Sequence, residues 1–118
     1  MIIELSDEIY SDFIETSEKA IFIDFYSPRC GPCQDVLAQL SSLDNYFKDG
    51  AIIAKVDVTK NPRLAHKYEI SSVPFCVSIG ADDKMLKDFE LGPASIDRYI
   101  RMIKKAQGVG FFRRLFSN

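Results

Sequence analysis

Apolar and polar residues follow one another along the chain in blocks that predict strands and helices in turn. Short, mostly apolar runs bounded by turn-forming residues predict strands at 2–5, 20–26, 51–58, 75–79 and 85–91. The second run is nearly continuous, which is typical of a strand covered on both faces of a sheet. A short loop separates the last two runs, so we expect these two strands to form a hairpin.

The segments between the strands carry apolar residues at helical spacing. We expect helices after Ser6, over 32–47, from Asn61 to about residue 68, and after Ser95. Ser6, Asn61 and Ser95 are residue types that cap a helix N-terminus. Pro62 suits the first position of a helix, because the N–H that proline lacks would have no partner there.

The order of these elements predicts one α/β domain. Strands alternate with helices, and a hairpin precedes the last helix, so we expect a mixed sheet that is covered on both sides. The length of 118 residues fits a single domain. We assign that domain to 1–107 and treat 108–118 as a separate C-terminal tail.

Composition and charge narrow the classes of function. Hydrophobic residues make up 47% of the chain and charged residues 27%, which is sufficient for a packed core. The formal net charge of −2 argues against nucleic acid as the main partner. We find neither a secretory signal pattern nor an apolar run of the roughly 18 residues that a membrane span needs. Three cysteines are few for a secreted disulfide scaffold, so we expect a cytoplasmic protein.

The candidate chemistry lies where the strand 20–26 gives way to the next helix. The tetrapeptide Cys30-Gly31-Pro32-Cys33 places two cysteines three positions apart at this junction. A thiolate, and not a thiol, attacks a disulfide, and the first turn of a helix favours a thiolate through its unpaired N–H groups and partial positive charge. The motif therefore indicates dithiol redox chemistry, with Cys30 as the nucleophile and Cys33 as the resolving thiol.

A metal site and a structural disulfide are the alternatives for this pair. Structural zinc normally takes four ligands, and the other candidates, His66 and Cys76, have no matching spacing, so we expect no metal. A disulfide between Cys30 and Cys33 closes too short a loop to stabilise the fold much. We expect Cys76 to be a buried apolar side chain, with a regulatory thiol as the alternative, and His66 to be a surface residue.

Asp24 is the second feature of chemical interest, because it is an acid within the apolar run 20–26. Burial raises the pKa of a carboxyl group, and it is costly unless the acid is paired or protonated. A raised pKa makes an acid useful for proton transfer near neutral pH. A solvent-facing Asp24 is the alternative, but its neighbours Ile23 and Phe25 leave it little room.

These residues resemble those of the thioredoxin family, and the resemblance covers about residues 1–106. Residues 30–33 match the family's active-site tetrapeptide, Asp24 matches a buried acid, and Lys55 matches a lysine close to that acid. Val73-Pro74 matches the segment that carries a cis-proline opposite the dithiol, and Gly92 matches a glycine beside the substrate groove. The resemblance implies a thioredoxin fold, with a five-stranded mixed sheet in the order 1-3-2-4-5 flanked by four helices.

The resemblance also implies a function, which is protein-disulfide reduction by thiol–disulfide exchange. Such a protein holds no cofactor, acts on disulfide-containing proteins, and receives its electrons from a separate thioredoxin reductase. The acid that Asp24 matches helps to deprotonate the second cysteine, and Lys55 would be its electrostatic partner. The residues expected to line the substrate site are Arg29, Gly31, Pro32, Val73, Pro74 and Gly92.

The chain departs from the family pattern beside the dithiol. Arg29 stands where the family usually has tryptophan, and Tyr26 stands where it has an aromatic residue that is often tryptophan. Phe75 stands where threonine is common. The Arg29 cation favours the Cys30 thiolate, but an exposed charge pair contributes only about 0.2–1 kcal/mol. We therefore expect Arg29 to alter the choice of partner more than the redox potential.

Two other functions stay open on this evidence. One is a specialised disulfide oxidase or isomerase, and the other is a binding subunit with a thioredoxin fold that docks through the tail 108–118. If the tail is helical, its apolar residues share one face: Phe111, Phe112, Leu115 and Phe116. We expect the tail to pack on its own domain or to be flexible, because so short a segment forms no stable helix alone. Docking on a partner or an anionic surface is the alternative, without stable membrane insertion.

Overall fold

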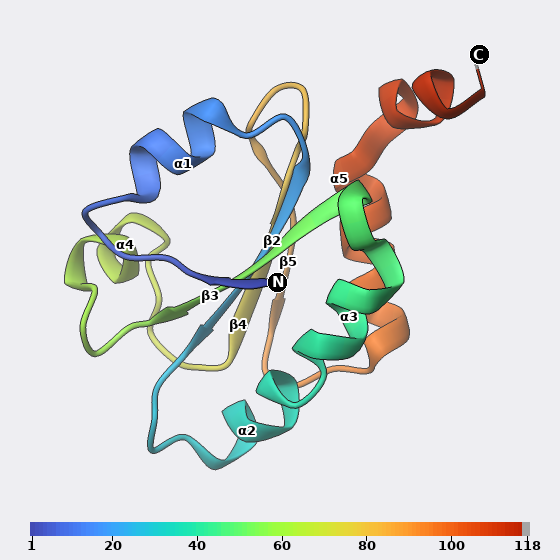
Figure 1. Ribbon diagram of the computed structural model, residues 1–118. Coiled ribbons are helices and arrows are strands. Elements are labelled where there is room, and N and C mark those ends of the chain that lie inside the picture. The colour runs from blue at the N-terminus through green and yellow to red at the C-terminus, as the bar shows by residue number, and fades with distance from the viewer. Residues whose placement is uncertain (117–118) are drawn as a thin grey trace.

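A mixed five-stranded sheet forms the centre of the molecule (Figure 1). The computed structural model describes residues 1–116, with side chains described as far as Gly108. The strands are β1 (Ile2–Glu4), β2 (Ala20–Tyr26), β3 (Ala51–Asp57), β4 (Phe75–Ile79) and β5 (Leu86–Leu91). They lie in the order β1-β3-β2-β4-β5; β1, β2 and β3 are parallel, and β4 runs antiparallel to both β2 and β5. The predicted α/β fold and strand order are confirmed.

Helices cover both faces of the sheet. They are α1 (Tyr10–Thr16), α2 (Gly31–Leu37), α3 (Leu40–Phe47), α4 (Pro62–Lys67) and α5 (Ile96–Phe116). In Figure 1, α1 and α4 lie on one side of the sheet, and α3 and α5 lie on the other. Alternate residues of β2 enter two separate apolar cores, with Phe22 on the α3 and α5 side and Ile21, Ile23 and Phe25 on the opposite side. This alternation explains why the strand is apolar throughout.

The single helix expected at 32–47 is divided into α2 and α3, so this prediction was wrong. The helix is interrupted at Ala38 and Gln39. The N–H of Gln39 bonds to the carbonyl oxygen of Val36, only three residues earlier, at 2.9 Å, which tightens the backbone locally. The side-chain amide of Gln39 donates to the carbonyl oxygen of Ala94 at 3.3 Å, so this junction is also tied to the segment before α5.

Of the three predicted helix caps, one is absent, one holds its position without a capping side-chain bond, and one is present. Helix α1 begins at Tyr10, not directly after Ser6, and its N-terminus has no side-chain cap. Asn61 is the N-cap residue of α4, as predicted, but its side chain makes no capping bond. Instead, that side chain accepts a hydrogen bond from the N–H of Asp7 and donates one to the carbonyl oxygen of Asp57. The predicted cap at Ser95 is present, because its hydroxyl accepts a hydrogen bond from the N–H of Arg98.

Helix α5 bends at Gly108, where the backbone has a φ of 68°. Only the backbone is described beyond this point, as far as Phe116. The apolar face predicted for the tail falls on side chains outside the described residues, and the boundary between 107 and 108 stays a prediction. Over residues 1–116, no helix combines the length and apolar character that crossing a membrane requires.

Candidate active site

The two cysteines of the tetrapeptide lie at the start of α2 and form a disulfide, with their Cα atoms 5.2 Å apart. Cys30 is the N-cap residue, and the backbone N–H of Cys33 donates to the Cys30 sulfur at 3.2 Å. In the reduced protein this N–H would stabilise a negative charge on the Cys30 sulfur, as a capping group does for an anion at a helix N-terminus. Pro32 occupies the first turn, as predicted.

The two sulfur-bearing residues differ in exposure. Cys33 is completely buried, whereas Cys30 is half-buried and has exposed neighbours at Arg29, Gly31 and Pro32. Of the two residues, only Cys30 is therefore partly open to the surface. This difference supports the predicted roles of nucleophile and resolving thiol.

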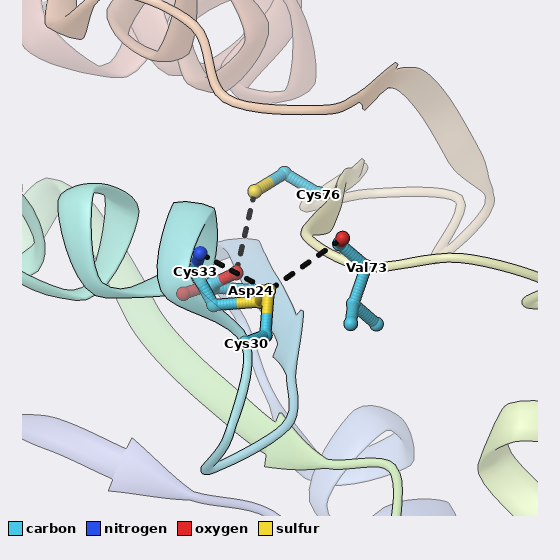
Figure 2. Close-up of a disulfide and its surroundings, with 5 residues drawn as sticks. All are labelled: Asp24, Cys30, Cys33, Val73 and Cys76. Carbon is cyan, nitrogen blue, oxygen red and sulfur yellow. Dashed lines mark hydrogen bonds between the residues drawn. A yellow bond between two sulfur atoms is a disulfide. The ribbon is translucent and has the colours of Figure 1, made fainter.

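A loop from a distant part of the chain faces the dithiol. The carbonyl oxygen of Val73 lies 3.7 Å from the Cys30 sulfur (Figure 2). The Val73–Pro74 peptide bond is cis. The carbonyl oxygen of Pro74 accepts a hydrogen bond from the N–H of Gly92 at 2.8 Å. Gly92 has a φ of 83°, a conformation that strains a side-chain-bearing residue, so glycine is needed there. The structure thus brings Val73, Pro74 and Gly92 together beside Cys30.

Asp24 is fully buried on β2, on the same face of the sheet as Phe22. Its two register partners are Lys55 on β3 and Cys76 on β4. The Cys76 thiol donates a hydrogen bond to Asp24 Oδ1 at 3.6 Å, whereas Oδ2 has no partner within the described residues. Burial raises the pKa of Asp24 to about 7, and the Cys76 hydrogen bond and the Lys55 charge offset part of that rise.

Lys55 lowers the pKa of Asp24 electrostatically, as predicted, but its direct contacts are with other residues. Its ammonium nitrogen lies 3.6 Å from a carboxylate oxygen of Glu4 and 5.7 Å from the centre of the Tyr26 ring. No ion pair between Lys55 and Asp24 occurs in the described part of the chain. Lys55 therefore acts on Asp24 through its field, which lowers the pKa of the acid, while Glu4 holds the ammonium group directly.

Comparison with known proteins agrees with this geometry. The family model of thioredoxin matches residues 1–105. The chain belongs to the thioredoxin family. It is 32% identical over 99 residues to a thioredoxin of Buchnera aphidicola (75% of this chain, 91% of that protein) and 35% identical over 95 residues to thioredoxin of Bacillus subtilis (80% and 83%). It is also 35% identical over 81 residues to chloroplastic thioredoxin Y2 of Arabidopsis thaliana, covering 69% of this chain but only 48% of that protein.

The thioredoxin fold is also supported by a solved structure. A crystal structure of chloroplastic thioredoxin z has a TM-score of 0.80 over 90% of this chain and 94% of that chain, at 21% identity. Thioredoxins are protein-disulfide oxidoreductases, and the dithiol is at disulfide distance, so the chain is a thioredoxin-like disulfide reductase. The comparisons do not favour a specialised oxidase or isomerase, or a binding subunit.

Sequence reasoning missed two residues in the surroundings of Asp24. Cys76 is fully buried, as predicted, but its thiol also donates to the acid, and Tyr99 on α5 belongs to the same core cluster as Cys76. The alternation of apolar residues along 75–79 places Cys76 on one face of its strand, but the pairing with β2 that sets it opposite Asp24 has no local signal.

His66 is exposed, as predicted. Among the described residues, no cluster of three or more side chains could hold a metal ion.

Proposed function

We propose that the reaction begins with the thiolate of Cys30. It attacks one sulfur of a substrate disulfide, forms a Cys30–substrate disulfide, and expels the other substrate sulfur as a thiolate, which takes a proton from water. The observation that carries this assignment is the exposure difference between half-buried Cys30 and fully buried Cys33. The N–H of Cys33, which donates to the Cys30 sulfur, supports the same choice of nucleophile.

The second step uses Cys33 and Asp24. Asp24 accepts the proton of the Cys33 thiol, and the Cys33 thiolate then attacks the Cys30 sulfur. The Cys30–Cys33 disulfide forms, the bond to the substrate breaks, and the second substrate sulfur leaves as a thiolate, so that two electrons have passed to the substrate. A pKa of about 7 supports this role, because Asp24 then accepts and returns a proton near neutral pH.

The substrate would lie in the space around Cys30. The backbone of Val73 faces the Cys30 sulfur, so an extended substrate segment could pair with it main chain to main chain. Pro74 and Gly92 fix the course of this loop through their backbone hydrogen bond. Arg29 is exposed next to Cys30, so its charge would determine which partner charges are favourable at that position.

The partners proposed are disulfide-containing proteins and a thioredoxin reductase that returns the protein to its dithiol form. The family match supports both classes, without naming an individual substrate. We place the reaction in a reducing compartment, the cytoplasm, because the chain has only three cysteines. Chloroplastic proteins are among its relatives, and a fluorescent fusion imaged in the source cell would distinguish these two compartments.

The roles of the two cysteines are tested by trapping. The reduced Cys33→Ser variant, mixed with an oxidised substrate protein such as insulin, should accumulate a covalent adduct at Cys30, whereas Cys30→Ser should form none. Non-reducing electrophoresis and peptide mass spectrometry read the adduct directly. The double variant, which retains only Cys76, controls for reaction at that buried thiol. An adduct with Cys30→Ser and none with Cys33→Ser would reverse the assignment.

A further inference from the structure

We propose that Cys76 is a positioning residue for Asp24, and that with Tyr99 it forms a directed chain of hydrogen bonds ending on the buried carboxylate. The inference rests on the proposed function, because it deepens the role given there to Asp24. The three side chains come from three elements, β2, β4 and α5, and lie on the face of the sheet that α3 and α5 cover. Figure 2 shows Cys76 and Asp24 joined beside the disulfide.

The contact between Cys76 and Asp24 follows from strand pairing. Their residues are register partners on adjacent antiparallel strands, so their side chains lie side by side on one face of the sheet. Both residues have 0% exposure, and the sulfur lies 3.6 Å from Oδ1. At this depth a hydrogen-bond donor changes the energy of a carboxylate far more than it would at the surface.

The direction of the hydrogen bonds is determined by the backbone. The N–H of Ala94 donates to the hydroxyl oxygen of Tyr99 at 2.9 Å, so this oxygen acts as the acceptor. The hydroxyl hydrogen of Tyr99 is then free to point toward the sulfur of Cys76, which lies in the same core cluster. The thiol hydrogen of Cys76 is left for Asp24 Oδ1. Tyr99 itself is held by an edge-on contact with the ring of Phe22, with ring centres 5.3 Å apart.

The other groups around Asp24 do not replace this donor. Lys55 on β3 gives its direct contact to Glu4, and Tyr26 on β2 directs its hydroxyl to the same carboxylate. Cys33 on α2 is the thiol whose proton Asp24 is proposed to accept. Cys76 therefore supplies the one side-chain hydrogen bond that Asp24 receives within the described residues. Burial and the nearby acid raise the pKa of Cys76, so the thiol keeps its hydrogen and remains a donor.

The test compares three variants of the full chain. Cys76→Val removes the donor, Cys76→Ser keeps a donor at the same place, and Ser78→Ala is the matched control. Ser78 lies two residues further along β4, on the same face and fully buried, and its hydroxyl has no partner within the described residues. The carboxyl carbon resonance of Asp24, followed by NMR across pH, gives the midpoint of its titration. Single-turnover kinetics give the rate at which a mixed disulfide is resolved.

We expect Cys76→Val to raise the midpoint of Asp24 by about 0.5–1 pH unit, which is a three- to tenfold change in proton affinity. Resolution of the mixed disulfide should slow by about the same factor below the midpoint. Cys76→Ser should restore the wild-type pH profile or move the midpoint downward, and Ser78→Ala should leave it unchanged. Restoration by serine excludes a purely structural effect, because a serine in an apolar core is not a better packing residue than valine.

A midpoint in Cys76→Val within about 0.2 unit of the wild type would overturn the proposal. An equal shift in Ser78→Ala would overturn it as well. If Cys76→Val does not fold, Tyr99→Phe removes the preceding donor and should shift the midpoint upward by a smaller amount; no shift there overturns the directed chain. Wild-type resolution in Asp24→Asn would instead contradict the proton-acceptor role of Asp24, while the titration midpoint continues to report on the bond from Cys76.

Discussion

Asp24 is a carboxylic acid in the middle of a strand whose other residues serve the core. Its position is unfavourable for a charge, and burial raises its pKa to about 7. At neutral pH about half of the molecules therefore carry a proton on this group. This is the condition in which one acid both accepts a proton from Cys33 and releases it later.

The first prediction concerns the kinetics of Asp24→Asn. Formation of the mixed disulfide should stay close to the wild-type rate, because the Cys30 thiolate is stabilised by the N–H of Cys33. Resolution should slow by about ten- to hundredfold at neutral and lower pH, since Cys33 loses its proton acceptor. At higher pH the two proteins should converge, because hydroxide then deprotonates Cys33. Stopped-flow measurement of both steps checks this, and equal slowing of both would mean a structural role for Asp24.

At the scale of secondary-structure elements, helix α4 obtains its N-terminal cap from a distant residue. The carboxylate of Asp7 accepts hydrogen bonds from the N–H groups of Arg63 at 3.0 Å and Leu64 at 2.8 Å. This contact ties the segment after β1 to the helix that precedes the Val73–Pro74 loop. A carboxylate also interacts favourably with the positive end of the helix.

We therefore predict that Asp7→Ala lowers the free energy of unfolding by about 0.5–2 kcal/mol, the usual range for loss of an N-terminal cap. Glu8→Ala is the matched control, because Glu8 is an exposed acid next to Asp7 and should change stability by less than about 0.5 kcal/mol. Urea denaturation of both variants measures the difference. Equal losses would show that the effect arises from charge in this segment and not from the cap.

The same elements show which features were predictable from sequence. The bounds of β2 and β4 follow from their apolar runs, because strands buried in a sheet leave a local pattern. The cap of α4 was assigned to Asn61, since a sequence shows only neighbours, whereas Asp7 is 57 positions from its partner Leu64. The pairing of Asp24 with Cys76 was missed for the same reason. Both contacts depend on tertiary register, which local propensity does not encode.

At the scale of the whole molecule, one edge of the sheet collects the reacting groups. The dithiol follows β2, the Val73–Pro74 loop precedes β4, and Gly92 follows β5. Because β4 is antiparallel to both neighbours, the end of β2, the start of β4 and the end of β5 lie at the same edge. The resemblance to thioredoxins supplied this strand order, whereas the element pattern alone indicated only a mixed sheet.

Asp24 also links the stability of the whole fold to pH. Its pKa rises from 3.8, its ordinary value, to about 7 in the folded protein, so the folded state binds the proton more tightly. The contribution of Asp24 to the free energy of unfolding is therefore fully present below pH 4. It falls as the pH rises toward 7 and is lost above that pH. The total amounts to about 4 kcal/mol, at 1.36 kcal/mol for each pH unit.

Asp24→Asn should remove this dependence, because an amide does not titrate. We expect the oxidised variant and the oxidised wild type to have similar free energies of unfolding near pH 4. The variant should become the more stable protein as the pH rises, by about 4 kcal/mol at pH 8. Asp35→Asn makes the same substitution at an exposed residue of α2 and should follow the wild type across the range. Urea denaturation from pH 4 to pH 8 decides the matter. A constant difference between Asp24→Asn and the wild type would mean that folding does not change the pKa of Asp24, and the raised pKa that supports its role in the second step would then be absent.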